Sequence, residues 1–592
     1  MATSQRILNI NLGVLGHIDS GKTSLAKALS TIASTACFDK HPESKERGIT
    51  LDLGFSSFAV PLPEHMAGLP YDSIQYTLVD CPGHASLIRT IIGGAQIIDL
   101  MMLVVDATKG IQTQTAECLV IGEILCDKMV VVLNKIDLFP EAKREASVEK
   151  ITKRLSKTLA TTKFVSSPII PVSAKPGGPE GPEGQSVGVD KLIKTLSLHS
   201  SVPVRTGDGP FLFAVDHCFG IKGQGTVMTG TILNGSVAVN NTIEIPSLKV
   251  TKKVKSMQSF RQPIQNAMQG DRVGVCVTQF DPKLLERGLV CSPGTLSTLY
   301  AAIVSMHKIQ YFKGAVSSKS KFHVTVGYDT VMARLSLFGT PTDSQHVPSP
   351  DFSFDREYCH QDELLVEPST KSKTEAAAAV ADSLDKKTDI VVGRQFGLLE
   401  FERPVTCPSN SLIIGSRLDT DIHSNMCRIA FHGHIIEGLT DKFYPETVLP
   451  KLKVFKVKKR EGVVERLQDE YTVIVRSIFK KETNMQLFAG LRVKLSTGED
   501  GVIEGSFGQS GKSKVRIPAG LLQETQKLLS SHKKKGGKSK SGWCKQHRSS
   551  LRYTDGILLD EDGSLTDSRE SNIRVTLQFK RYSFDAAKKM IQ

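Results

Sequence analysis

The most informative stretch in the first part of the chain is Gly16-His17-Ile18-Asp19-Ser20-Gly21-Lys22-Thr23. It has the spacing G-x-x-x-x-G-K-[ST] of a phosphate-binding loop, between an apolar run typical of a buried strand and a segment with a helical pattern. Backbone amides at the start of such a helix face the phosphates, and the helix dipole favours negative charge. Lys22 would reach the β- and γ-phosphates, and the Thr23 hydroxyl would bind Mg²⁺. The residues expected at the phosphates are Asp19, Ser20, Gly21, Lys22, Thr23 and Ser24.

Length and composition indicate a multidomain protein that binds a polyanion. The chain has 592 residues and a formal net charge of +14, and its length suggests about three to five domains. A basic chain of this size often binds nucleic acid, and the alternative is a basic surface without such a partner. The eleven cysteines lack metal-binding spacing and predict reduced core residues in the cytosol. We expect no signal peptide and no membrane association, because no apolar run is long enough to cross a bilayer.

Strands and helices alternate from Ile7 to about Ser200, which predicts a mostly parallel sheet covered on both faces. The ligand of such a sheet binds at the carboxyl ends of its strands. The strands are expected at Ile7–Leu15, Leu51–Phe58, Ile74–Val79, Leu100–Val105, Met129–Leu133 and Ile169–Val172. The helices between the later strands are expected near Ser86–Ile98, Gln114–Leu125, Glu141–Leu159 and Val189–Leu198.

Two further motifs concern the γ-phosphate. Thr50, in Arg47-Gly48-Ile49-Thr50, can complete Mg²⁺ coordination only when a γ-phosphate is present, which predicts a switch segment. The second motif is Asp80-Cys81-Pro82-Gly83-His84, after the third strand. In it Asp80 can hold Mg²⁺ through water, Gly83 can donate its amide to the γ-phosphate, and His84 is the candidate to position the attacking water.

Two more motifs concern the base. Asp137, in Asn134-Lys135-Ile136-Asp137, can accept two hydrogen bonds from the edge of guanine, whereas adenine lacks that pair of donors. Ser173-Ala174-Lys175 ends the sixth strand and would present a backbone amide to guanine O6. Each short motif alone is weak evidence for a nucleotide-binding site. All five motifs in order, each near a strand end, predict a domain over residues 1–205 that binds GTP with Mg²⁺.

Helical patterns disappear after about residue 206, and short alternating strands predict two β-barrels, at 206–300 and 301–445. The stretch at about 341–390 has many polar and few large apolar residues, so we expect a largely disordered surface insertion, with a helix as the alternative. The strands expected in the barrels are Phe211–Val215, Gly225–Leu233, Thr242–Ile245, Arg272–Val277, Lys321–Val326, Met332–Phe338, Phe396–Phe401, Leu412–Ser416 and Cys427–His434.

A fourth, mainly-β domain is expected at 446–592. In Lys451–Arg460, strand alternation would place Leu452 and Val454 inward and a ladder of lysines outward. Between Gln526 and Arg552 there are nine Lys or Arg and no Asp or Glu. This basic stretch, at about 526–570 and expected to be disordered, resembles a nuclear localisation or RNA-binding tract, and a solvated tail is the alternative.

The motifs Gly-His-Ile-Asp-Ser-Gly-Lys-Thr, Arg-Gly-Ile-Thr, Asp-Cys-Pro-Gly-His and Asn-Lys-Ile-Asp resemble the set of the translational GTPases. The chain resembles elongation factor Tu over three domains, and it resembles the eukaryotic selenocysteine-specific elongation factors over nearly its full length. The most specific stretches are Asp80–Gly94, Val215–Gly230 and Ala267–Cys291; the weakest match lies beyond about Leu521. The resemblance implies a P-loop GTPase domain, two elongation factor Tu-like barrels and an appended domain IV.

The resemblance also implies residue roles. It gives His84 the catalytic role, and Ile18 and Ile49 match the apolar pair that fences this histidine from the nucleotide. Ser20 stands where elongation factor Tu commonly has histidine, away from the glycine–lysine–threonine core. The strand at Phe211–Phe219 resembles the one that borders the aminoacyl group.

Arg272 matches the arginine that the selenocysteine factors place beside Asp216 and His217. A selenol ionises more readily than a thiol, so a pocket for it should offer positive charge. We expect Arg272 and protonated His217 to hold the selenolate, with Asp216 raising the proton affinity of the histidine. A structural ion pair that closes the barrel is the alternative.

The expected function is an elongation factor and GTPase that delivers selenocysteinyl-tRNA to the ribosome at recoded UGA codons. The resemblance names the selenocysteine insertion element of the messenger RNA, and the protein that binds it, as further partners. We expect a monomer in the cytoplasm, with the nucleus as a second location. The alternatives are a GTP-dependent module for initiator tRNA or other RNA with incidental hydrolysis, and a sulfate-activating GTPase subunit, which leaves the basic fourth domain unexplained.

Overall fold

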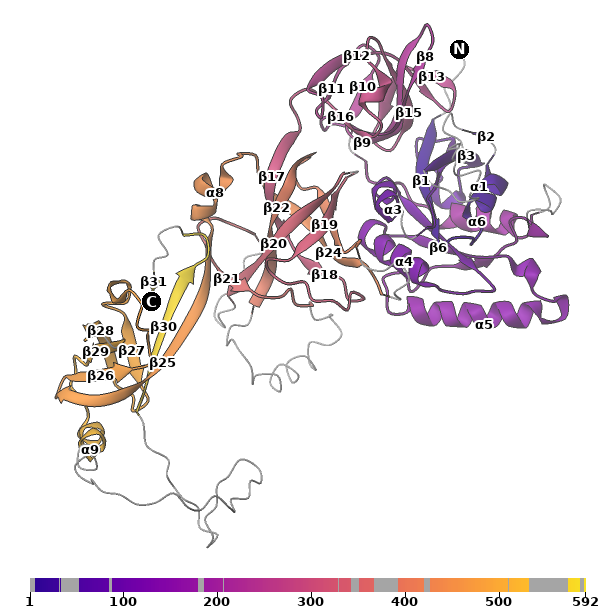
Figure 1. Cartoon of the computed structure of the whole chain (residues 1–592). Helices are drawn as coiled ribbons and strands as arrows, with labels where there is room; N and C mark the ends of the chain where they lie inside the picture. Colours follow the sequence, from indigo (N-terminus) through magenta and orange to yellow (C-terminus); the bar gives the residue numbers. More distant parts are fainter. Residues whose placement is uncertain are drawn as a thin grey trace, which may run out of the picture. The chain divides into compact units, whose positions relative to one another are not determined.

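The computed structural model describes residues 6–30, 32–33, 53–84, 88–178, 186–205, 207–327, 329–341, 351–366, 392–419, 426–508, 511–531, 573–585 and 590–592. The chain divides into two compact units (Figure 1). The first consists of Met1–Pro350 and Gln361–Tyr444, and the second of Asp351–His360 and Pro445–Gln592. No helix within the described ranges is long and apolar enough to cross a membrane.

The first unit begins with an α/β domain whose sheet, in its described part, has the strand order β2-β3-β4-β1-β5-β6-β7. The pairs from β4 to β7 are parallel, and β2–β3 and β3–β4 are antiparallel, so the predicted mostly parallel sheet is confirmed. The strands are β1 (Ile7–Gly16), β2 (Ile32–Ala33), β3 (Gly54–Pro61), β4 (Ser73–Asp80), β5 (Leu100–Asp106), β6 (Met129–Asn134) and β7 (Ile169–Pro171).

Helices cover both faces of this sheet (Figure 1). Helices α1 (Lys22–Leu29) and α6 (Val189–His199) pack on one face through Leu25 and Leu192, against Leu12 and Leu78 of the strands. The opposite face is covered by α3 (Ile88–Ala95), α4 (Thr113–Leu125) and α5 (Glu141–Leu159). This double cover explains why the central strands are continuous apolar runs.

The second domain of this unit is an antiparallel barrel in which β11-β16-β8-β9-β15-β12 close through the β11–β12 pair. Its core alternates along the strands, and in β15 Val273, Val275 and Val277 point inward. The strands are β8 (Leu212–Ile221), β9 (Gly225–Asn234), β10 (Ser236–Ala238), β11 (Thr242–Ile245), β12 (Val250–Ser259), β13 (Gln262–Ile264), β14 (Asn266–Met268), β15 (Arg272–Val277) and β16 (Gly288–Cys291).

The third domain is a second antiparallel barrel, closed in the order β19-β23-β24-β17-β22-β20 by the β19–β20 pair. Arg428, just before β24, joins it to the first domain: its backbone amide, Nε and Nη2 donate to the carboxylate of Glu117 in α4 at 3.1, 2.9 and 2.7 Å. The strands are β17 (Ser297–Ser305), β18 (His307–Lys308), β19 (Lys321–Val326), β20 (Asp329–Pro341), β22 (Val392–Cys407), β23 (Leu412–Ser416) and β24 (Ile429–Leu439).

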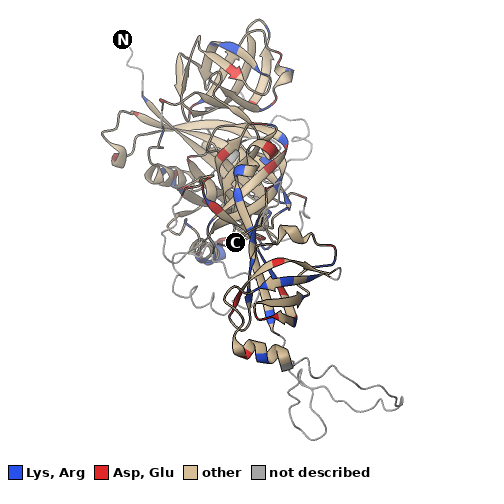
Figure 2. Ribbon diagram, turned by 90° about the vertical axis from the view of Figure 1, so that its left-hand side faces the viewer, with Lys and Arg blue, Asp and Glu red and all other residues tan. Residues whose placement is uncertain are grey.

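The second unit is a third antiparallel barrel, β25-β26-β29-β28-β27-β30, closed by the β25–β30 pair. Lys and Arg recur along its strands, with Asp and Glu interspersed (Figure 2). The elements are β25 (Lys453–Asp469), β26 (Thr472–Arg476), β27 (Arg492–Leu495), β28 (Asp500–Phe507), β29 (Lys512–Arg516), α9 (Gln523–Ser531), β30 (Arg574–Tyr582) and β31 (Met590–Ile591). Most of the basic stretch at 526–570 lies outside the described residues, and its first residues belong to α9.

Two expectations differ from the structure here. Within the insertion at 341–390, which we expected to be largely disordered, β21 (Glu357–Gln361) pairs in parallel with β25. Tyr358 of β21 is fully buried and stacks on Phe352, which gives the segment an apolar centre. The ladder in β25 is also incomplete: Leu452 and Val454 are buried as expected, but the guanidinium of Arg460 lies over the ring of Phe488, at 4.8 Å from its centroid.

Candidate functional site

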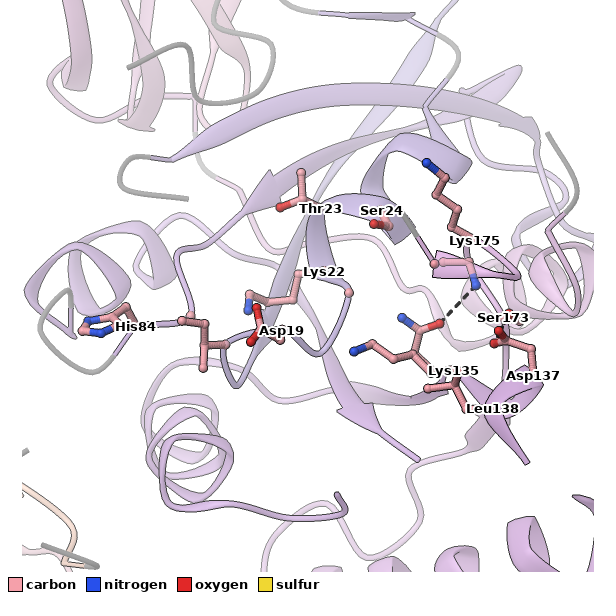
Figure 3. A pocket seen from close by; sticks show the side chains of 16 residues that line it. Asp19, Lys22, Thr23, Ser24, His84, Lys135, Asp137, Leu138, Ser173 and Lys175 are labelled. Carbon is pink, nitrogen blue, oxygen red and sulfur yellow. Dashed lines mark hydrogen bonds between the residues drawn. The ribbon is translucent and has the colours of Figure 1, made fainter. Parts of the chain in front are cut away.

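A cavity of about 700 Å³ lies at the carboxyl ends of β1, β4, β6 and β7, where the sequence motifs meet (Figure 3). In Figure 3 His84 lies at one end of the cavity, beyond Lys22, and Asp137 with Ser173 at the other. The lining residues are Ile18, Asp19, Gly21, Lys22, Thr23, Ser24, Gly83, His84, Asn134, Lys135, Asp137, Leu138, Ser173, Ala174, Lys175 and Gly178.

Two glycines shape the end at which Lys22 lies. Gly21, directly before α1, has φ +84°, and a Cβ there would collide with the Asn134 amide. A Cβ at Gly83 would collide with the Lys22 ammonium. Neither position has room for a side chain, so the backbone amides of both loops can approach a ligand in the cavity.

Lys22 is a buried cation at the centre of this end. Its Nζ donates to the backbone carbonyl of His17 at 2.7 Å, and only 6% of the residue is exposed. Burial lowers the pKa of the Lys22 ammonium, and the nearby carboxylate of Asp80 opposes that shift. A phosphate group would add further negative charge beside the buried ammonium, and so would favour its charged form.

Thr23 and Asp80 form a hard-oxygen pair beside Lys22. The Thr23 hydroxyl donates to Asp80 Oδ2 at 2.7 Å, and Asp80 is buried at the end of β4. A hydroxyl and a carboxylate oxygen fit Mg²⁺, which takes few protein ligands and completes its shell with phosphate and water oxygens. Among the described residues, no group of three or more His, Cys, Asp or Glu could hold a metal ion.

Asn134 connects the loops at the other end of the cavity. Its Nδ2 donates to the Ser20 carbonyl at 2.9 Å, and its Oδ1 accepts from the Ala174 amide at 3.1 Å (Figure 3). Lys135 next to it has φ +65° and its Nζ lies 2.9 Å from Asp106 Oδ2. The side chain of Asn134 therefore fixes the phosphate loop to the segment at 173–175.

Asp137 presents a carboxylate at the same end. Its Oδ1 accepts from the Ser173 hydroxyl, and its Oδ2 accepts from the Gly177 amide at 3.3 Å. Both carboxylate oxygens therefore act as hydrogen-bond acceptors, and two acceptors side by side are what the two N–H groups of a guanine edge require. An adenine edge offers no such pair of donors.

The structure places most of the residues predicted for the nucleotide site in this one cavity, with four exceptions. Asp80 does not line the cavity but accepts the hydrogen bond of Thr23, which does. Ser20 is buried and contributes its carbonyl to Asn134. Ile49 and Thr50 lie outside the described residues. The sequence analysis missed Asp106, which pairs with Lys135, and Leu138 and Gly178, which line the cavity. For Leu138 the available signal was its position directly after Asp137.

The second set of predicted residues lies on the outer face of the first barrel. Arg272 Nη1 donates to Asp216 Oδ2 at 2.6 Å, with the side chains 3% and 2% exposed. Asp216 lies at a register shift in β8, between Val215 and His217, and His217 is half-buried. Arg272 and Asp216 therefore form a buried ion pair, which both the predicted pocket and its structural alternative contain.

Three families match consecutive parts of the chain. The family described as elongation factor Tu GTP binding domain matches residues 8–201. The family described as selenocysteine-specific elongation factor, eukaryotes, 3rd domain matches residues 303–433. The family described as eEFSec C-terminal RIFT domain matches residues 450–588.

Relatives and solved structures agree with these matches. The chain is 56% identical to the selenocysteine-specific elongation factor of Mus musculus over 595 residues, 99% of either chain. It is 39% identical to the factor of that name from Methanocaldococcus jannaschii over 339 residues, 57% of this chain and 67% of the relative. The crystal structure of translation elongation factor SelB from Methanococcus maripaludis in complex with the GTP analogue GppNHp is similar with a TM-score of 0.62 and 27% identity, covering 87% of this chain and 98% of that one. Its apo form has a TM-score of 0.61 and 26% identity, covering 98% and 100%.

Proposed function

The chain belongs to the family of selenocysteine-specific elongation factors, and we propose that it delivers selenocysteinyl-tRNA to the ribosomal A site at UGA codons recoded by a selenocysteine insertion element. It is a translational GTPase with an elongation factor Tu-like GTP-binding domain. The observation that carries the proposal is that four of the five sequence motifs line a single cavity. The division into domains at 1–205, 206–300, 301–445 and 446–592 is part of the proposal.

GTP would bind with its phosphates at Lys22 and its base at Asp137. The buried ammonium of Lys22 and the amides around Gly21 and Gly83 would stabilise the charge that develops on the γ-phosphate, since positioning and electrostatics dominate phosphoryl transfer. His84, at the end of the cavity beyond Lys22, would orient the attacking water, and Ile18 would shield it until the ribosome rearranges the site. Thr23 and Asp80, with Thr50, would hold Mg²⁺, which when bound neutralises charge between the β- and γ-phosphates.

The aminoacyl end of the tRNA would bind beside Arg272. The selenolate is an anion, and an anion is costly to bury without a partner, so a fixed guanidinium favours it over a neutral hydroxyl or thiol. In the proposed arrangement, Arg272 and His217 face the selenium and Asp216 orients Arg272. The ion pair of Arg272 and Asp216 supports this role for the carboxylate.

The other partners follow from the second unit. We infer that its basic strands, with the basic stretch that follows them, contact the selenocysteine insertion element RNA or the protein that binds this element. The same basic stretch is the ground for proposing a nuclear location beside the cytoplasmic one, and the proposed assembly state is a monomer.

The experiment that tests the function measures how fast the ester bond of the aminoacyl-tRNA hydrolyses. We expect the protein to protect selenocysteinyl-tRNA when GTP is bound and to release it with GDP, while seryl-tRNA stays unprotected in both states. Equal protection of seryl-tRNA, or protection of initiator tRNA alone, would contradict the proposal and favour the initiator-tRNA alternative.

A further inference from the structure

Another cavity of the GTPase domain, of about 720 Å³, lies between helix α5 and the segment at 107–111, which follows β5. Four basic side chains line it, and none of the described residues that line it is acidic. These side chains are Lys109, Lys150, Arg154 and Lys157, which are all exposed. In the described part of the chain none of the four has an ion-pair partner, so their charges are available to a ligand.

Three of these cations form a ridge along α5. Lys150 and Arg154 are four positions apart, and Arg154 and Lys157 are three positions apart, so they lie on one face of the helix. At a rise of about 1.5 Å per residue, this cation ridge is about 10 Å long. Like charges at these spacings repel one another and destabilise a helix. An anionic partner along the ridge would remove that repulsion.

An apolar wall lies beside the cation ridge. Ile151 and Leu155 come from α5, Ile111 from the opposite segment, and Phe139 from the turn before α5. Leu155 is buried, whereas Ile151 and Phe139 are half-buried and Ile111 is 37% exposed. A partner that covers this wall gains from the removal of apolar surface from water, in addition to the pairing of charges.

The segment at 107–111 is fixed by Asp106, so the cavity is already formed without a partner. The Asp106 carbonyl accepts from the amides of Lys109 and Gly110 at 3.2 and 2.8 Å, and its Oδ1 accepts from the Thr108 amide at 2.8 Å. The Oδ2 of Asp106 lies 2.9 Å from the Nζ of Lys135, which lines the nucleotide cavity. A partner that binds a preformed cavity loses less free energy to the ordering of its walls.

We propose that this cavity is a docking site for an acidic amphipathic segment of a partner protein. The Asp or Glu side chains of the segment pair with the cation ridge, and its apolar side chains cover Ile111, Phe139 and Ile151. The phosphates of a nucleic acid would also pair with the cations, but its backbone offers little apolar surface to the wall beside them. The inference is independent of the proposed delivery of tRNA, since it uses neither the nucleotide cavity nor the first barrel.

The test measures the binding of fluorescent synthetic peptides to the full-length protein with GDP bound, by anisotropy. The peptides have about 15 residues, the length at which an isolated helix becomes marginally stable. One set has glutamates along one face and Leu, Ile or Phe beside them. In a second set lysines replace the glutamates, and in a third set serines replace the apolar residues. We expect the first set to bind, and the second and third sets to bind at least about tenfold more weakly.

Variants of the protein locate the binding. Lys150→Gln/Arg154→Gln should weaken the first set about fivefold to tenfold, since each exposed ion pair contributes little alone. Ile111→Ser, at a partly exposed position, should weaken the first set and leave the third set unchanged. The matched control is Lys143→Gln/Lys153→Gln, which removes two charges from the same helix outside the cavity and should bind as the parent does.

Three results would overturn the inference. The first is that no peptide of the first set binds. The second is that the control pair weakens binding as much as Lys150→Gln/Arg154→Gln, because the attraction would then be to the net charge alone. The third is that an oligouridylate of similar length binds more tightly than the first set and loses this affinity in Lys150→Gln/Arg154→Gln, which would assign the cavity to RNA.

Discussion

At the scale of single residues, Asp137 should decide which base the protein accepts. Asparagine at this position would replace one acceptor with a donor, so Asp137→Asn should weaken GTP binding and improve binding of xanthosine triphosphate. The loss of a base-specific bidentate pair costs about 1–3 kcal/mol by analogy with base readout in nucleic acids. Competition between the two nucleotides measures the preference.

The matched control for this change is Asp127→Asn. Asp127 is an exposed carboxylate of the same domain, whose Oδ1 lies 3.6 Å from Lys163 Nζ, and it does not line the cavity. This control should keep the parent preference. If Asp137→Asn also kept it, guanine recognition would have to come from the segment at 173–175 alone.

His84 should matter for hydrolysis and hardly for binding. It lines the cavity at the end opposite Asp137, so His84→Ala should leave the affinity for GTP nearly intact. A positioned side chain that assists proton transfer or orients water typically contributes about 10²–10⁴-fold, and we expect a loss of this size in GTP turnover on programmed ribosomes.

His65→Ala serves as the comparison for His84→Ala. The Nε2 of His65 lies 3.1 Å from the Ser200 carbonyl, in the same domain but outside the cavity. Turnover at the parent rate by His84→Ala would remove this residue from the mechanism. Equal slowing by both variants would indicate a general loss of structure.

At the scale of elements, the paired strands β18 and β24 contain an acid-sensitive group of histidines. His307 and His432 are opposite in register, with ring centroids 5.2 Å apart, and His434 lies two residues further along β24. Burial, followed by the neighbouring His307 and His434, lowers the pKa of His432 to about 4. The folded protein therefore resists protonation of His432 in a pH range where the unfolded chain, with a pKa of about 6.5, takes up the proton.

The stability of the first unit should consequently fall as the pH falls from about 6.5 to about 4. The contribution of His432 is at most about 3 kcal/mol. Comparison with His432→Asn isolates it, because asparagine does not titrate: the difference in unfolding free energy between parent and variant should shrink toward acid. A difference that is constant across this range would show that His432 titrates normally in the folded state.

Elements with a strong local pattern were predicted well, and elements that depend on distant partners were not. Helix α5 has the predicted bounds Glu141–Leu159, and β19 and β23 also match, because their apolar residues recur with a regular period. Strand β21 was missed since its five residues pair with β25, about a hundred positions later. The same reason explains Arg460, whose aromatic neighbours Phe479 and Phe488 come from other parts of the barrel.

In the candidate site, too, the residues with a local sequence pattern were predicted, and the contacts between distant residues were not. The motifs place Lys22, Asp80 and Asp137 at strand ends, so their convergence follows from the geometry of a parallel sheet. Side-chain pairing across domains has no local pattern. Arg272 of β15 pairs with Asp216 of β8, and only the resemblance to the family, not a local pattern, brought these residues together in the sequence analysis.

At the scale of the whole molecule, the two units combine different tasks. The first unit contains the nucleotide cavity and the predicted aminoacyl pocket, joined by the guanidinium of Arg272, which lies over the ring of Phe55. The second unit carries exposed lysines on β25. This unit also includes most of β21, so a truncation before Pro445 would remove β25 and leave β21 without its partner. Its role is therefore better tested by charge changes in the full chain.

Lys458 and Lys459 of β25 are exposed, and Lys459 shares only a surface ion pair with Glu461, at 2.9 Å with both side chains about half exposed or more. Such a pair is worth little, so both lysines can turn to phosphates. If each contacts single-stranded RNA, the slope of log affinity against log salt should become shallower by roughly 0.7 per lost contact, or about 1.4 in Lys458→Gln/Lys459→Gln. This slope is measured from the affinity for selenocysteine insertion element RNA at several salt concentrations, from low to moderate.

The matched control is Lys150→Gln/Lys157→Gln, which removes two exposed charges from α5 of the first unit and should leave the slope unchanged. An unchanged slope in the β25 variant, or an equal change in both variants, would show that the RNA does not contact this strand.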